Sequence, residues 1–286
     1  MSVFRTPRRV NRAWVGVLPF LAFCFAFEII PILILLRGSF SDKAGAFTLL
    51  NYEKVSAPIY VRSFWNSIQL SAVTAILGTL LGLLVGYAIF RLPSARVREA
   101  LITLSDVTTN FAGAPLAFAF IVVLGSSGVV TLAFEQYLGL KLYPTFSIYS
   151  YSGLVLAYLY FQLPLMILLI IPAFTGLRRE WRESAQNLGA TTPQYWWRIG
   201  LPILAPSLIA GLVLLFANAF GAYATAWTLG GSNIALVTIQ IAFTITGEVL
   251  HDPGAGDALA MLSLAVMSAC IAVYHFANSR ARRWVR

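Results

Sequence analysis

Six long apolar stretches alternate with short polar segments along the chain, at 14–36, 64–90, 101–124, 153–175, 203–227 and 257–277. Each is long enough to cross a bilayer, because about 20 mostly apolar residues span roughly 30 Å of hydrocarbon. The alternating pattern of a membrane barrel is absent, and helices are the other structure that satisfies every backbone polar group in lipid. The pattern therefore predicts an all-α integral membrane protein with six transmembrane helices.

Composition agrees with this class. Hydrophobic residues make up 59% of the chain and charged residues 11%, with a mean hydropathy of +0.79, whereas soluble domains are about 25% charged. Four arginines precede the first apolar stretch, as in a signal peptide. However, the stretch from Trp14 to Leu36 is longer than the apolar region of a signal peptide and has no small-residue cleavage site. We expect it to be retained as the first span.

Lysine and arginine are distributed unevenly between alternate loops. With the N-terminus inside, fifteen of the 20 lie on the cytoplasmic side and five lie outside, as the positive-inside rule predicts. The cytoplasmic set is Arg5, Arg8, Arg9, Arg12, Arg91, Arg96, Arg98, Arg178, Arg179, Arg182, Arg198, Arg280, Arg282, Arg283 and Arg286. The outer set is Arg37, Lys43, Lys54, Arg62 and Lys141. Both termini are thus predicted to be cytoplasmic, and the net charge of +9 reflects membrane topology rather than nucleic-acid binding.

The cytoplasmic loop 176–202 has the signals of two short helices. Trp181, Ala185 and Leu188 are spaced to form one apolar stripe, and Gly189 is placed to end the first helix in a left-handed conformation. A second helix is expected from Pro193 to Ile199.

The second helix has its own boundary signals. Thr192 is the expected N-cap of this helix, and Pro202 is expected to close it. Such a projection suits docking into a groove of a soluble partner, but an amphipathic helix on the lipid surface is equally compatible with these residues.

The loop resembles the EAA motif of permease subunits of binding-protein-dependent type I ABC importers. That motif has E-A-A, three residues, G, nine residues and I-x-L-P, and the chain matches it at Glu183-Ser184-Ala185, Gly189 and Ile199-Gly200-Leu201-Pro202. Ser184 in place of alanine is the single departure. Phe161–Pro164 and Phe220–Thr225 are similar to spermidine/putrescine-type permeases, and iron and phosphonate permeases are similar there.

This resemblance implies a single transmembrane domain over 1–286 in a bacterial inner membrane. Its loop would be a coupling helix seated in a cleft of an ATPase subunit. The implied coupling residues are Glu183, Ser184, Ala185, Gly189, Ala190, Ile199, Leu201 and Pro202. The implied partners are two ATPase subunits, a second permease subunit, identical or different, and an extracytoplasmic substrate-binding protein.

We expect no catalysis by this chain. A phosphate-binding loop of the form G-x-x-x-x-G-K-[ST] is absent, so ATP and Mg²⁺ are expected on the separate ATPase and no cofactor or metal on this chain. Gly125–Gly128 matches the G-x-S-G of rhomboid proteases, but Ser127 and His275 are predicted on opposite membrane faces, where they cannot form a nucleophile–base pair. His251 and His275 are likewise too far apart for a metal site. A stand-alone channel or secondary transporter is the alternative from another class.

Polar residues within the spans are candidates for the solute pathway, since they are costly in lipid. The candidates are Glu28, Asn110, Gln162, Asn218 and Tyr223. Hydrogen bonding between helices is an equally good explanation for each. Glu248, Asp252 and Asp257 give the last outer loop an acidic character, which favours a cationic solute such as a polyamine. A face that meets the binding protein explains them equally well, and iron(III) and phosphonate-type solutes remain alternatives.

Overall fold

The computed structural model describes residues 16–247 and 251–281. The described chain is helical, with one isolated antiparallel bridge between Ser41 and Phe47. Six segments are long and apolar enough to cross a membrane. They are Leu18–Ser39, Pro58–Phe90, Ala114–Leu138, Tyr151–Thr175, Thr192–Gly221 and Pro253–Phe276. This confirms the predicted all-α fold with six candidate spans.

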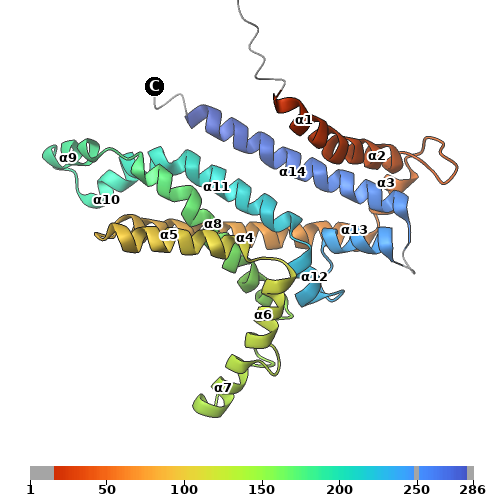
Figure 1. Ribbon diagram of the computed structural model, residues 1–286, viewed down its shortest axis with the longest axis horizontal. Coiled ribbons are helices and arrows are strands. Elements are labelled where there is room, and N and C mark those ends of the chain that lie inside the picture. The colour runs from red at the N-terminus through yellow and green to blue at the C-terminus, as the bar shows by residue number, and fades with distance from the viewer. Residues whose placement is uncertain (1–15, 248–250, 282–286) are drawn as a thin grey trace, which may run out of the picture.

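Four long helices form the body of the molecule, as Figure 1 shows. They are α4 (Pro58–Phe90), α8 (Tyr151–Thr175), α11 (Leu201–Gly221) and α14 (Pro253–Ala281). The helix α5 (Ala95–Asn110) packs against α8. The segments 90–98 and 176–202 lie together at one end of this bundle, which we call the arginine-rich end (Figure 1).

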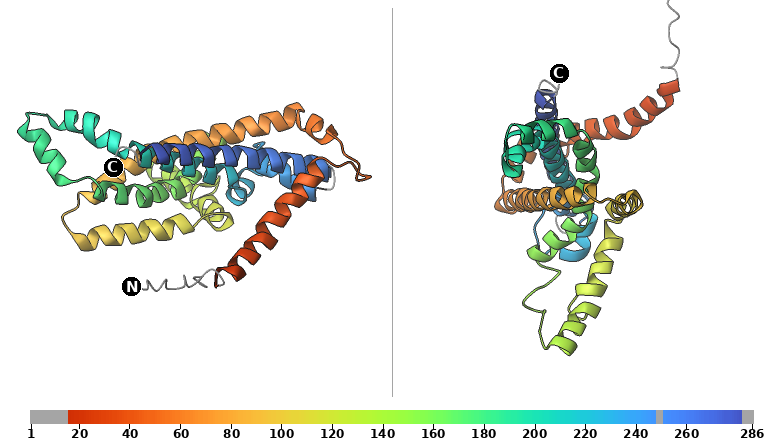
Figure 2. Two further views of the ribbon diagram at one scale, coloured as in Figure 1. Left: turned by 90° about the horizontal axis from the view of Figure 1, so that it is seen from above. Right: turned by 90° about the vertical axis from the view of Figure 1, so that its left-hand side faces the viewer.

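The remaining helices surround this body. The first span consists of α1 (Leu18–Cys24), the π-helical turn η2 (Phe25–Ile29) and α2 (Ile30–Ser39). It diverges from the bundle in Figure 2, with α2 packing on α14. At the end opposite the arginine-rich end lie α3 (Leu50–Val55) and α13 (Val237–Thr246), whereas α12 (Ala224–Gly230) lies beside α6 (Ala114–Leu124) (Figure 1).

Glycines let α4 approach α8 closely. A Cβ atom on Gly82 would lie 2.5 Å from the Cβ of Met166, and one on Gly86 would lie 2.6 Å from Cγ2 of Ile170. These distances are too short for any side chain, so the small-residue spacing of α4 serves helix packing. Met166 and Ile170 are themselves buried in the core between α4, α8 and α11.

The predicted third span, 101–124, is wrong as a single helix. It is divided between α5, which ends at Asn110, and α6 (Ala114–Leu124). The break follows from Gly113, whose φ of +75° suits glycine, and from Pro115 in the first turn of α6. The apolar segment long enough to cross is instead α6 with α7 (Val129–Leu138), and these two helices project away from the bundle in Figure 1.

The predicted fifth span, 203–227, also needs correction at its end. The helix α11 stops at Gly221, and α12 starts at Ala224 after two residues of non-helical connection, Ala222 and Tyr223. The other predicted spans fall within helices of the structure, apart from the first residues of 14–36, which lie outside the described residues.

Candidate functional site

Two local hydrogen-bonding motifs fix the conformation of the loop 176–202 at the arginine-rich end. The helix α9 (Arg179–Asn187) is terminated by Gly189 at the C′ position, where φ is +80°. The Gly189 N–H donates to the Gln186 carbonyl and the Ala190 N–H to the Ala185 carbonyl, each at 2.9 Å. This pair of bonds is a Schellman motif, and it confirms the predicted role of Gly189.

The second helix begins one residue earlier than predicted. Thr191, not Thr192, is the N-cap of α10 (Thr192–Tyr195). The Gln194 N–H donates to the Thr191 hydroxyl at 3.4 Å, and the Thr191 N–H donates to the Gln194 side-chain carbonyl at 2.8 Å. This capping box satisfies two helix-end donors at once, which explains why Thr191 is used.

Pro202 does not end this second helix, contrary to the prediction. The turn η3 (Trp196–Gly200) is π-helical and leads directly into α11. The Leu201 N–H donates to the Trp196 carbonyl, five residues back. Pro202 has no N–H to donate to a helical hydrogen bond, and the wider π-helical turn just before it accommodates this proline. The loop and α11 therefore form one continuous helical element.

Aromatic rings join this loop to the core helices. The ring of Trp196 meets the ring of Tyr87 edge-on, with centroids 5.2 Å apart. Tyr87 and Phe90 of α4 each lie 5.6 Å from the ring of Phe174 at the end of α8. Tyr195 is buried beside Trp196. These rings therefore place the loop in contact with the end of α4, and the end of α4 in contact with the end of α8.

The predicted coupling residues have different environments within the loop. Ala185 is buried, whereas Glu183, Ser184, Gly189 and Pro202 are exposed. Ala190, Ile199 and Leu201 are half-buried. The Glu183 carboxylate accepts a hydrogen bond from Nε of Arg179 at 2.8 Å.

The predicted apolar stripe on α9 holds only in part. Ala185 is buried and Trp181 is half-buried, but Leu188 lies past the last helical residue and is 88% exposed. Trp197 is 77% exposed on the same loop. Two large apolar side chains thus face outward at the arginine-rich end.

Gln162 does not face a pathway in this structure. It is completely buried, and its Nε2 donates to the Thr74 hydroxyl at 3.0 Å between α8 and α4. Of the two explanations for this residue, the structure favours hydrogen bonding between helices.

Two helix breaks meet inside the bundle. The Thr225 hydroxyl donates to the Gly113 carbonyl at 3.3 Å, which joins the start of α12 to the break before α6. The buried Tyr158 hydroxyl donates to the Ala222 carbonyl at 2.8 Å. Non-helical backbone at membrane depth is tolerated where it is buried in protein or lines a water-filled cavity. This junction is a feature that the sequence analysis missed, although Gly113 and Pro115 were visible signals.

The remaining pathway candidates are exposed on the surface of this single subunit. Asn110 ends α5 at one break and donates to the Asp106 carbonyl at 2.9 Å. Tyr223 lies in the other break and is stacked on Trp227 with centroids 6.3 Å apart. Asn218 is exposed on α11, one turn before the break, and Glu28 is exposed in η2 on the diverging first span.

Of the acidic residues in the predicted outer loop, Asp252 is paired with a lysine. Asp252 forms an ion pair with Lys54 at 2.5 Å. Burial alone would raise the pKa of Asp252, but the hydrogen bonds from Lys54 and from the Ala255 N–H, with the charges of Lys54 and Lys43, hold that pKa below its usual value. The Asp257 carboxylate fills the space over Gly38, and Glu248 lies outside the described residues.

The chain is similar in sequence to permease proteins of transport systems. The spermidine/putrescine transport system permease protein PotB of Haemophilus influenzae is 28% identical over 268 residues, which cover 91% of each chain. PotB of Escherichia coli is 25% identical, covering 74% of this chain and 78% of its own. The probable sulfate transport system permease protein cysT of Chlorokybus atmophyticus is 26% identical, covering 79% of this chain and 74% of its own.

Solved structures of ABC transporters have the same fold. A bacterial alginate ABC transporter in complex with an alginate pentasaccharide-bound periplasmic protein matches with a TM-score of 0.72 at 17% identity, covering 96% of this chain and 95% of its own. The MetNI methionine ABC transporter matches with a TM-score of 0.55 at 16% identity, covering 79% and 95%.

Residues 78–284 match the family described as "binding-protein-dependent transport system inner membrane component". This span includes the whole loop of α9, α10 and η3. The match excludes the protease and the stand-alone carrier or channel as interpretations. The chain belongs to this family and is a multi-pass permease subunit of an ABC importer in a bacterial inner membrane.

Proposed function

We propose that this chain forms one half of a solute pathway and that an ATPase subunit drives it through the loop of α9 and α10. The observation that carries this proposal is the loop 176–202 itself, because the large apolar side chains of Leu188 and Trp197 are exposed at its surface. Exposed apolar side chains on an otherwise polar projection favour a docking partner. The family supports a separate ATPase, on which ATP and Mg²⁺ are bound.

The loop can transmit force because hydrogen bonds fix its conformation and an aromatic contact joins it to α4. The Schellman motif and the capping box fix the angle between α9 and α10, and Trp196 rests on Tyr87 of α4. When two ATPase subunits close on ATP, they pull the two coupling loops of the permease pair together. The outward-facing state is then favoured to the extent that ATP binds the closed ATPase pair more tightly.

The pathway runs past the two helix breaks. Asn110, Asn218 and Tyr223 lie at or beside these breaks and are exposed on the single subunit. A second permease subunit, identical or different, would face them and close the pathway. A binding protein on the opposite side from the arginine-rich end delivers the solute, as the alginate transporter's complex with a periplasmic protein supports by analogy.

Two solute classes are candidates. A polyamine is supported by the likeness to the PotB proteins. The acidic outer loop supports it less than its sequence suggested, because Asp252 is neutralised by Lys54. An anionic solute is the second candidate, and it is favoured by an arginine-containing pocket at the outer end of α4.

Purification of the tagged permease from its native membrane tests the coupling proposal. We expect an ATPase to co-purify with the unaltered chain and to be lost with Glu183→Ala. The Arg179–Glu183 pair is exposed, and such pairs contribute about 0.3–0.5 kcal/mol to a helix, so the substitution leaves α9 folded. Glu180→Ala removes the same charge from the same exposed helix and is the matched control. Equal ATPase recovery with both variants would contradict the proposal.

A further inference from the structure

A polar stripe occupies the first turns of α4. Arg62, Asn66 and Gln69 are spaced by four and three residues, which places them on one face of the helix. The helix has 33 residues and is therefore roughly 50 Å long, well beyond the roughly 30 Å of hydrocarbon. Trp65 is 66% exposed at this level, as expected for an aromatic side chain at the membrane–water interface. The stripe thus lies near the outer mouth, where water can reach it.

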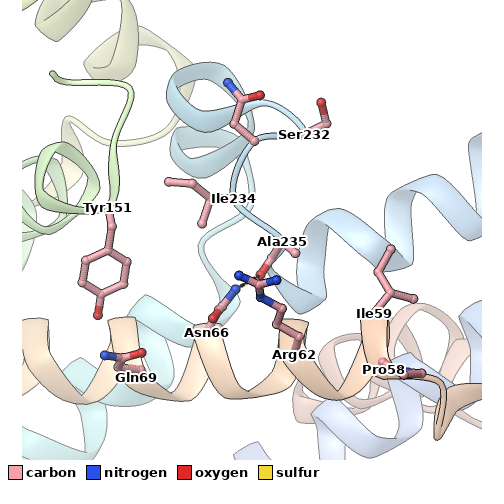
Figure 3. A pocket seen from close by; sticks show the side chains of 10 residues that line it. Pro58, Ile59, Arg62, Asn66, Gln69, Tyr151, Ser232, Ile234 and Ala235 are labelled. Atoms are coloured by element: carbon pink, nitrogen blue, oxygen red, sulfur yellow. Dashed lines mark hydrogen bonds between the residues drawn. The ribbon is translucent and has the colours of Figure 1, made fainter. Parts of the chain in front are cut away.

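The stripe forms one wall of a pocket of about 610 Å³. Tyr151 at the start of α8 and the 232–235 segment between α12 and α13 form the other walls, as Figure 3 shows. Asn66 is held in place, because its Nδ2 donates to the Ala235 carbonyl at 3.0 Å. The pocket is therefore built from three separate elements, with one amide fixed by a hydrogen bond.

The polar groups of this pocket include donors that have no partner. The Tyr151 hydroxyl is buried and makes no hydrogen bond, although buried hydroxyl groups normally find one. Within the described residues, the Arg62 guanidinium forms neither an ion pair nor a hydrogen bond. Gln69 and Ser232 add a side-chain amide and a hydroxyl.

The charge of the pocket is positive and uncompensated. Arg62 is the charged residue among the ten that line it, and none of the ten is acidic. A guanidinium presents a planar fork of N–H donors that matches the oxygens of a carboxylate, sulfate or phosphonate. A cationic group placed here would be repelled by Arg62 and would find no carboxylate to bind.

We propose that this pocket binds the anionic group of the solute, a carboxylate, sulfate or phosphonate, on its way into the permease. Arg62 binds the oxyanion, and the Tyr151 hydroxyl donates a further hydrogen bond. From there α12 leads directly to the helix break at Ala222 and Tyr223, so the pocket precedes the proposed pathway. The inference rests on the proposed function, since it requires this chain to form a solute path.

Labelling of arginine by phenylglyoxal tests this site in the importer complex purified in maltoside detergent. The labelling rate of Arg62 is followed by mass spectrometry, with sulfate as the probe and chloride at equal ionic strength as the control. We expect millimolar sulfate to slow Arg62 labelling at least about threefold, as a bidentate contact would, and spermidine to give no protection. Arg37, exposed near the same end of the molecule, is the internal control and should be labelled equally in all conditions.

A variant that removes one hydroxyl distinguishes sulfate binding in this pocket from a general effect of ionic charge on the labelling of Arg62. Tyr151→Phe keeps the ring and leaves Arg62 available for labelling, and it should weaken the protection by sulfate. Equal protection by chloride, no protection by sulfate, or no labelling of Arg62 in any condition would overturn the proposal. Protection that occurs only in phosphatidylglycerol nanodiscs, and not with sulfate in detergent, would assign the site to a lipid headgroup instead. The ATPase recovered with the same sample tests the proposed function separately, because its loss would contradict coupling whatever the labelling shows.

Discussion

The ring of Trp196 in the loop 176–202 meets the ring of Tyr87 in α4 edge-on, with centroids 5.2 Å apart. This contact joins the surface on which we propose that the ATPase docks to a helix that crosses the membrane. Tyr87 in turn contacts Phe174 at the end of α8. We therefore expect movement of the loop to displace two core helices.

Breaking this contact should uncouple the loop without preventing docking. Aromatic pairs contribute about 0.5–1.5 kcal/mol beyond the area that they bury, and we expect Tyr87→Leu to lower solute uptake severalfold while the ATPase still co-purifies. Tyr87→Phe keeps the ring and should transport normally. Uptake assays on cells and ATPase recovery from the same membranes measure the two effects. Normal uptake by Tyr87→Leu would show that force passes elsewhere.

The angle of the loop depends on Gly189. Its φ is +80° and a Cβ atom would meet nothing within 4 Å, so alanine is opposed there by backbone strain alone, about 1–2 kcal/mol. We expect Gly189→Ala to reduce recovery of the ATPase, because the strain is relieved by changing the angle between α9 and α10.

Gly45 provides a matched control for that experiment. It has a φ of +82° and equally open surroundings, but it lies in the loop between α2 and α3. Gly45→Ala carries the same strain far from the loop 176–202 and should leave ATPase recovery unchanged. A similar loss of ATPase from both variants would indicate general destabilisation and contradict a special role for Gly189.

We expect the Lys54–Asp252 pair to make the stability of the folded chain sensitive to acid. Because the pKa of Asp252 is lowered in the folded protein, its contribution to stability is fully present above the ordinary pKa of an aspartate, near 4. That contribution is lost as the pH falls through the lowered value. We expect thermal stability to be insensitive to this pair between about pH 5 and 8 and to decrease in stronger acid.

Asp252→Asn tests this dependence. The variant should have lower thermal stability than the unaltered chain at neutral pH, and the difference should shrink as the pH is lowered below about 4. Scanning fluorimetry of the purified complex across this range measures both. A difference that stayed constant down to the lowest pH would mean that the ion pair contributes nothing to stability.

Features set by local chemistry were predictable from the sequence. The number of spans and the positions of the first, second, fourth and sixth follow from hydropathy, and the end of α9 follows from the glycine that a left-handed C′ position requires. The N-cap was wrong by one residue because two threonines are adjacent, and Gln194, three residues after Thr191, was the signal that decides between them.

Features that depend on the course of the chain within the membrane were not predictable in this way. Hydropathy measures how apolar a segment is, and it does not detect that Gly113 and Pro115 divide the segment and redirect it. The pocket around Arg62 was not predicted, because the second span was expected to begin at residue 64, which leaves Arg62 in a loop. Pro58 at the first turn of α4 was the signal that the helix begins earlier.

Substitution of Gln162 tests whether its side chain serves helix packing or solute transport. Its hydrogen bond to Thr74 is fully buried, and such bonds between membrane helices contribute about 0.6 kcal/mol on average. Methionine has a volume similar to that of glutamine and carries no amide that needs a hydrogen-bond partner. The Thr74 hydroxyl keeps its own hydrogen bond to the Leu70 carbonyl at 2.8 Å. We therefore expect Gln162→Met to assemble normally and to retain uptake within about twofold of the unaltered chain. Asn218→Leu, at an exposed position beside the helix break, should lower uptake more strongly if that face lines the path. Loss of uptake by Gln162→Met in a fully assembled complex would instead mean that α8 rotates during transport and brings this amide into the pathway.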